Sequence, residues 1–125
     1  MAELGIKAMA HGMAAHAAAR QAQIARNVAN ADTPGYRATD IPDFAATIDP
    51  GVRLRTTRPG HVGADAAPGA LRTVQRDAEA SPNGNTVSLE VEMMHAAGAR
   101  QAHDMALSIY SSASDILNSA LGRAR

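Results

Sequence analysis

Two long segments, one at each end of the chain, carry apolar or small residues mostly at every third or fourth position. In the first, from about Glu3 to Ala31, these residues are Ile6, Met9, Met13, Ala17, Ile24 and Val28. In the second they are Val87, Val91, Met94, Gly98, Ala102, Met105, Ile109, Ala113, Ile116 and Ala120. Because this spacing follows one face of an α-helix, we predict two long amphipathic helices.

A proline and a glycine end the first segment. Pro34 cannot continue a helix and restricts the residue before it, so the helix is expected to finish near Ala31 or Asp32. Gly35 then supplies a turn. The amides that precede this turn can bond free helix carbonyls, and the tyrosine that follows it can anchor the turn by packing. We therefore predict a fixed elbow made of Asn27, Asn30, Thr33, Pro34, Gly35 and Tyr36.

Turn-forming residues also bound the second segment. The cluster at residues 81–85 contains Pro82 and Gly84, and Thr86 or Ser88 follows as a possible N-cap. Gly122 closes the segment. The sequence therefore predicts a second helix from about residue 87 to residue 120, roughly 50 Å long at about 1.5 Å per residue.

Between the two helices, residues 37–81 differ in composition. Four of the six prolines of the chain fall here, so this segment is not expected to be helical. Val52–Thr56 and Leu71–Val74 are short and β-prone, which predicts at most a small hairpin or two extended arms. The predicted fold is mainly α: residues 1–36 and 82–125 form one antiparallel coiled-coil hairpin, and residues 37–81 form an extended or small β segment.

The predicted helices offer little bulk for a core. Hydrophobic residues make up 46% of the chain but most are alanine, and aromatic residues make up only 2%. Alanine favours helix yet buries little area, so we expect marginal stability and a partner surface. Gly98 in mid-helix is expected to mark a close helix crossing. The predicted subunit-interface residues of the second helix are Val87, Val91, Met94, Gly98, Met105, Ile109 and Ile116.

Several functional classes find no support in the sequence. The formal net charge is zero, which argues against nucleic-acid binding. Cysteine is absent, and the five histidines are not spaced as metal ligands. No nucleophile motif accompanies the serines of the second helix. We therefore expect no enzyme, metal or cofactor, and the start of the chain reads neither as a cleaved signal peptide nor as a membrane span.

Three segments carry a likeness to a known family. Residues 27–36, NVANADTPGY, resemble the N-terminal signature shared by the rod, hook and related axial proteins of the bacterial flagellum. Residues 55–62 and 83–93 resemble the middle and C-terminal segments of proximal rod members of that family. The likeness extends over most of the chain.

This resemblance implies a structural subunit of the proximal rod in the flagellar basal body. Such a subunit is exported by the flagellar type III apparatus, polymerises through its terminal helices in the periplasm, and helps form the drive shaft and export channel needed for motility. The implied partners are rod proteins of the FlgC, FlgF and FlgG types, FliE, the MS ring and further copies of the chain, without direct membrane insertion. Two alternatives stay open: a FlgC-type rod protein, or a small helical adaptor or chaperone that binds one partner helix.

Overall fold

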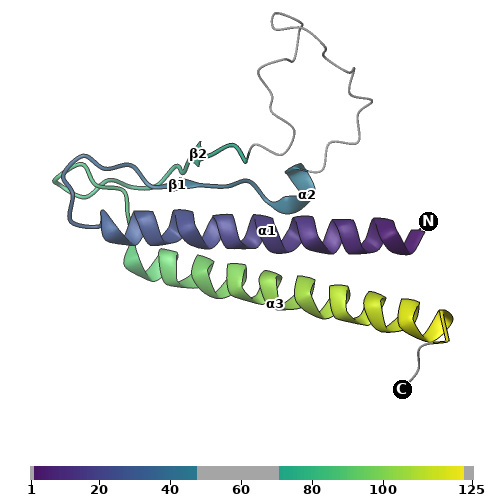
Figure 1. The fold of residues 1–125 in the computed structure, drawn as a ribbon. Helices are drawn as coiled ribbons and strands as arrows, with labels where there is room; N and C mark the ends of the chain where they lie inside the picture. Colours follow the sequence, from purple (N-terminus) through teal and green to yellow (C-terminus); the bar gives the residue numbers. More distant parts are fainter. Residues whose placement is uncertain (1, 48–70, 123–125) are drawn as a thin grey trace, which may run out of the picture.

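Two long helices form most of the structure, a computed structural model that describes residues 2–47 and 71–122. Helix α1 spans Ala2–Ala29 and helix α3 spans Leu89–Ala120. They lie side by side and run in opposite directions, so the start of α1 and the end of α3 lie at the same end of the hairpin (Figure 1). The predicted mainly helical fold, with terminal helices packed on each other, is confirmed.

The contact between the helices consists largely of alanine. On α3 the buried residues recur every seven positions, at Glu92, Ala99, Ala106 and Ala113. On α1 a matching seven-residue line runs through Ala10, Ala17 and Ile24. A seven-residue repeat keeps one side of a helix turned toward its partner, and methyl side chains let the two backbones approach closely.

Most of the predicted stripe of α3 turns away from α1. The exceptions are the buried Ala113 and the pair Ile109 and Ile116, which line a hollow with Ile6 of α1. Five of its large side chains are exposed in the chain: Val91, Met94, Met105, Ile109 and Ile116. Gly98 is also exposed, and a Cβ built on it would meet no atom within 4 Å. Within the described part of the chain no helix crosses α3 closely at Gly98, and a close crossing with a neighbouring subunit there stays a prediction. The pattern of large residues marked the wrong face because the close contact uses small ones.

The end of α1 and the start of α3 differ slightly from the prediction. Helix α1 ends at Ala29 rather than at Ala31 or Asp32, because the chain tightens there: Asn30 N donates to the carbonyl oxygens of Arg26 at 3.2 Å and of Asn27 at 3.1 Å. Ser88 occupies the N-cap position of α3 without a capping side-chain bond. Thr86, the other candidate, serves elsewhere, since its Oγ1 accepts a bond of 2.8 Å from Ala38 N.

A thin layer of extended chain covers one side of α1. Strands β1 (Thr39–Asp40) and β2 (Val74–Gln75) pair antiparallel, with Thr39 opposite Gln75 and Asp40 opposite Val74. The second predicted β segment thus forms a strand at its end, but its partner is β1; the other predicted segment, Val52–Thr56, lies outside the described residues. One helical turn, α2 (Phe44–Thr47), also interrupts the region predicted to lack helix.

Contacts with α1 hold this layer in place. The Nε2 atom of His16 lies 2.7 Å from the carbonyl oxygen of Pro42, and its ring packs at 5.6 Å from that of Phe44. Phe44 lies against Gly12, where a Cβ would come within 3.6 Å of the phenyl ring. Across the described ranges, neither long helix has a stretch apolar enough to cross a membrane.

Candidate functional site

The predicted elbow and the turn before α3 lie against each other. Gly35 N donates to the Asn83 carbonyl at 3.0 Å, and Thr86 N donates to the Tyr36 carbonyl at 3.0 Å. Gly35 and Gly84 both adopt positive φ, 73° and 81°. The positive φ favours glycine at both positions, and a Cβ on Gly84 would lie in contact with the Gly35 backbone at 3.4 Å. Two sequence segments that carried the family likeness are therefore neighbours in space.

One buried amide ties these two segments together. The Nδ2 atom of Asn85 lies 2.9 Å from the Asn30 carbonyl and 2.8 Å from those of Ala31 and Thr33. Its Oδ1 accepts from Val87 N at 2.7 Å. The carbonyls that follow α1 thus find a donor more than fifty residues away in sequence. The sequence analysis placed Asn85 only in a turn cluster and missed this role.

Replacing Asn85 by alanine is expected to lower the free energy of unfolding by about 2 kcal/mol, because the carbonyls that follow α1 lose their donor. The measurement is urea unfolding followed by far-ultraviolet circular dichroism. Asn118, exposed on α3, provides the matched control. Equal stability of Asn85→Ala and Asn118→Ala would contradict the role of Asn85 in tying the elbow to the turn before α3.

Asn27 connects three elements from a fully buried position. Its side chain, 0% exposed, donates through Nδ2 to the Thr39 carbonyl at 2.8 Å and to Glu92 Oε2 at 3.1 Å. Its Oδ1 accepts from Thr39 N and from the Tyr36 hydroxyl, both at 3.3 Å. Asn27 therefore joins the elbow, β1 and α3 rather than ending α1. Asn30 does bond a helix carbonyl as expected, that of Arg26, at 2.8 Å.

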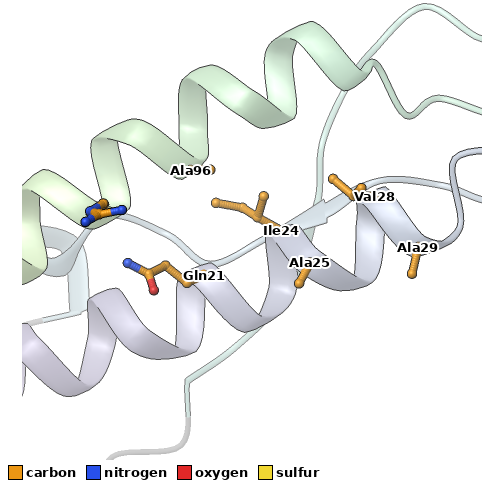
Figure 2. Close-up of a pocket in the computed structure, with 7 residues that line it drawn as sticks. Gln21, Ile24, Ala25, Val28, Ala29 and Ala96 are labelled. Carbon is orange, nitrogen blue, oxygen red and sulfur yellow. The ribbon is translucent and has the colours of Figure 1, made fainter.

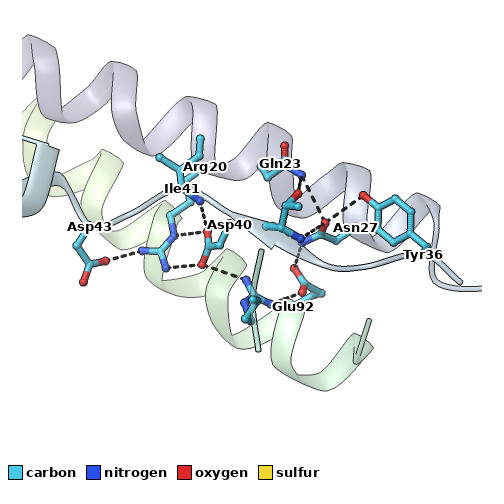
Figure 3. A network of polar contacts seen from close by, with 10 residues as sticks. Arg20, Gln23, Asn27, Tyr36, Asp40, Ile41, Asp43 and Glu92 are labelled. Carbon is cyan, nitrogen blue, oxygen red and sulfur yellow. Dashed lines mark hydrogen bonds and ion pairs between the residues drawn. The ribbon is translucent and has the colours of Figure 1, made fainter. Parts of the chain in front are cut away.

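A chain of alternating charges continues from this point (Figure 3). The fully buried carboxylate of Glu92 pairs with Arg76, and Arg76 Nη2 reaches Asp40 Oδ2 at 3.0 Å. Arg20 of α1 donates two parallel hydrogen bonds to the same Asp40 carboxylate, at 3.0 and 2.9 Å. Its remaining nitrogen lies 3.1 Å from Asp43. Every buried side-chain nitrogen and oxygen of the described residues has a hydrogen-bond partner.

The charges around Asp40 favour its ionised form. Burial alone would raise the pKa of Asp40, but hydrogen bonds from Arg20 and Arg76 outweigh burial and hold its pKa below the ordinary 3.8. A carboxyl whose pKa is lowered by folding adds stability above its unfolded pKa of about 3.9. That stability is lost as the pH falls through the folded pKa.

The pH dependence of unfolding should therefore change in the Asp40→Asn variant. At pH 7 we expect a lower melting temperature than that of the unmodified chain, and below about pH 4 we expect the difference to shrink. Thermal melts at pH 7, 5, 4 and 3 measure this. Asp115→Asn, at an exposed position, is the control. Melting curves for Asp40→Asn that run parallel to the unmodified chain at every pH would refute the role of Asp40.

The predicted site residues fall into two groups. The elbow residues from Asn27 to Tyr36 come together near the turn before α3. The predicted interface residues of α3 extend away from that turn along an exposed flank. Val87 is half-buried and precedes α3. Sequence reasoning missed Arg20, Asp40, Arg76 and Glu92. One signal pointed to Glu92: it stands seven residues before Ala99, in register with the alanine line.

The geometry of this site positions backbone segments rather than reactive groups. Its carboxylates are already neutralised by arginines, and its amides are occupied by carbonyls. Among the described residues no three histidine or acidic side chains are placed to hold a metal ion. What the site can do is fix the elbow at one end of the hairpin and leave the outer helix faces free.

Comparisons with known proteins match this arrangement. The profile of the family described as "Flagella basal body rod protein" matches residues 9–37, which cover most of α1 and the elbow. The chain is 35% identical to "Flagellar basal body rod protein FlgB" of Salmonella typhimurium (strain LT2) over 107 residues, 76% of this chain and 77% of the relative. The chain belongs to the flagellar basal body rod protein family. FlgB of Escherichia coli (strain K12) is 36% identical over 75% of this chain and 76% of its own.

Membership of the rod protein family confirms the resemblance drawn from the sequence. The matched relatives are described as FlgB, so the FlgC alternative is not favoured. The family match covers the residues whose side chains form the α1 half of the site, including Arg20 and Asn27. In this rod protein the conspicuous local signature, residues 27–36, thus coincides with the point where α1, β1 and α3 are fastened together.

Proposed function

We propose that this protein is a structural subunit of the proximal rod, polymerising through its terminal helices in the periplasmic part of the flagellar basal body. Its role there is to help form the drive shaft and the export channel, and we propose no enzymatic activity. The observation that carries the proposal, beside the family, is the outer flank of α3. It presents large apolar side chains to solvent, while the buried line between α1 and α3 is made mainly by alanines.

We name this flank the α3 stripe and define it by Val91, Met94, Gly98, Met105, Ile109 and Ile116. Exposed side chains at helical spacing suit packing against a helix of a neighbouring subunit. The elbow supports this role by fixing the direction in which the chain leaves α1. We propose further copies of this chain, rod proteins of the FlgC, FlgF and FlgG types, FliE and the MS ring as neighbours, and export without a cleaved signal peptide.

Deletion of the encoding gene, complemented by an epitope-tagged copy, tests the proposal. We expect the deletion to abolish filaments, and the tagged copy to restore them and to be present in purified basal bodies. A Met105→Glu copy should fold yet fail to restore filaments, because a charge would enter the packed stripe. Ser108→Glu, also exposed on α3, is the matched control. Normal filaments in the deletion strain would overturn the proposal and favour the adaptor alternative.

A further inference from the structure

A hollow of about 530 Å³ opens along one side of the contact between α1 and α3. Most of its wall comes from Ile24, Ala25, Val28 and Ala29 of α1 and from Ala96 of α3 (Figure 2). Gln21 and Arg100 also line it. Since the helices are antiparallel, these two polar residues, each one turn from the apolar wall, lie at the same end. This α1–α3 hollow is therefore apolar along its length with a cation at one end.

The hollow and the α3 stripe lie on opposite flanks of the hairpin. Arg100 follows the buried Ala99 by one residue, whereas Gly98 precedes it by one, and each step turns about 100° around the helix. Beside Ala96 and Arg100, one flank of α3 is thus hollowed, whereas Met94 and Met105 project from the other flank. Contacts between two different surfaces of identical chains are heterologous, and their repetition builds rings or helical assemblies.

Charge on α3 matches this pairing of surfaces. Glu90 is exposed and has no ion-pair partner among the described residues. It lies four residues before Met94, so both side chains project from the same side of the helix. If Met94 of one helix enters the hollow, Glu90 of the same helix lies one turn away from it. Arg100 likewise lies one turn away from Ala96 in the apolar wall, so the carboxylate and the guanidinium can meet.

We propose that the α1–α3 hollow receives Met94 of a second copy of this chain, whose Glu90 then pairs with Arg100. The inference rests on the proposed function and specifies how neighbouring copies meet. Met94 is 72% exposed, and its unbranched side chain can adapt to an irregular hollow lined by alanine. Gly98, which has open space where a Cβ would stand, lets the helix of the neighbouring copy approach closely.

Disulfide trapping tests this contact directly, because the chain contains no cysteine. Tagged copies carrying Ala25→Cys or Met94→Cys are expressed together or alone in the deletion strain, and basal bodies are isolated under oxidising conditions. We expect a cross-linked pair only where both variants are present, since the contact joins unlike surfaces. Cross-linking of either variant to itself would mean a symmetric contact, and cross-linking of Met94→Cys to a different rod protein would mean another occupant; either result overturns the inference.

Charge reversal provides an independent measurement. Arg100→Glu and Glu90→Arg should each lower the amount of tagged protein in basal bodies about tenfold, and the double variant should restore it, because like charges face each other only in the single variants. Ser108→Glu is the control for an added charge on α3. Melting temperatures of the isolated chains check that each variant folds. Failure of the double variant to recover overturns the Glu90–Arg100 pairing.

The two proposals fail in different ways. If both cysteine variants enter basal bodies but never cross-link to each other, the docking contact is wrong while the rod function stands. If the unmodified tagged chain is absent from basal bodies that support normal filaments, the proposed function itself is wrong.

Discussion

Glu92→Ala is expected to lower the free energy of unfolding by about 3 to 5 kcal/mol, the typical cost of removing one partner from a buried ion pair. The variant leaves the fully buried Asn27 amide without its carboxylate, and it leaves Arg76 with Asp40 as its remaining ion-pair partner. Since domains are stable by only about 5 to 15 kcal/mol, a large fraction of the chain should be unfolded at 37 °C. Urea unfolding followed by circular dichroism measures the loss.

Two further variants serve as comparisons for Glu92→Ala. Glu92→Gln keeps the shape and one accepting oxygen, so we expect a smaller loss than for alanine. Asp104→Ala removes an exposed carboxylate from the same helix and should change stability by no more than about 0.5 kcal/mol. If Glu92→Ala were no less stable than Asp104→Ala, the buried charge chain would not hold the fold.

Ala106→Leu should cost about 3 kcal/mol, at the upper end of the range for overpacking. Ala106 is 0% exposed in the line where the two backbones meet, so a larger side chain must push α1 and α3 apart. The measurement is the same urea titration. We also expect loss of filaments in the complemented deletion strain, because the hairpin would no longer close.

Gly98→Leu provides a matched contrast on the same helix. Open space surrounds Gly98 within the chain, and leucine has the higher helix propensity, so stability should rise by up to about 1 kcal/mol. Assembly should nevertheless fail, because the leucine stands in the α3 stripe where a neighbouring helix approaches. Equal stabilities of Ala106→Leu and Gly98→Leu would show that the contact between the helices has been assigned to the wrong face.

The sequence predicted the features that depend on local chemistry. Pro34 and Gly35 define the elbow because backbone restrictions act within a few residues. The two helices follow from their spacing and their high alanine content. Helix α1 ends at Ala29, earlier than predicted: the Asn30 side chain bonds the Arg26 carbonyl, and the distant Asn85 bonds the Asn30 carbonyl just beyond the helix. No local pattern reports a donor that comes from the other end of the chain.

The face of α3 that contacts α1 could not be predicted from hydrophobicity. The stripe of valine, methionine and isoleucine carried the stronger pattern, yet the contact uses alanines, whose value lies in their small size. An acidic residue in the first turn of a helix is favourable without any partner, so no local pattern indicates that Glu92 is buried against Arg76 and Asn27 from other elements. Strands β1 and β2 are likewise bracketed by contacts from distant segments, because Asp40 of β1 pairs with Arg20 of α1 and with Arg76, which follows β2.

Oxidation of individual methionines tests the central claim that the α3 stripe is the surface packed within the rod. Met94 and Met105 are 72% and 49% exposed in the isolated chain, so dilute peroxide should convert both to sulfoxide, as read by mass spectrometry of the α3 peptide. In purified basal bodies we expect both to be protected. Oxidation of Met94 and Met105 at the same rate in basal bodies as in the isolated chain would contradict that claim.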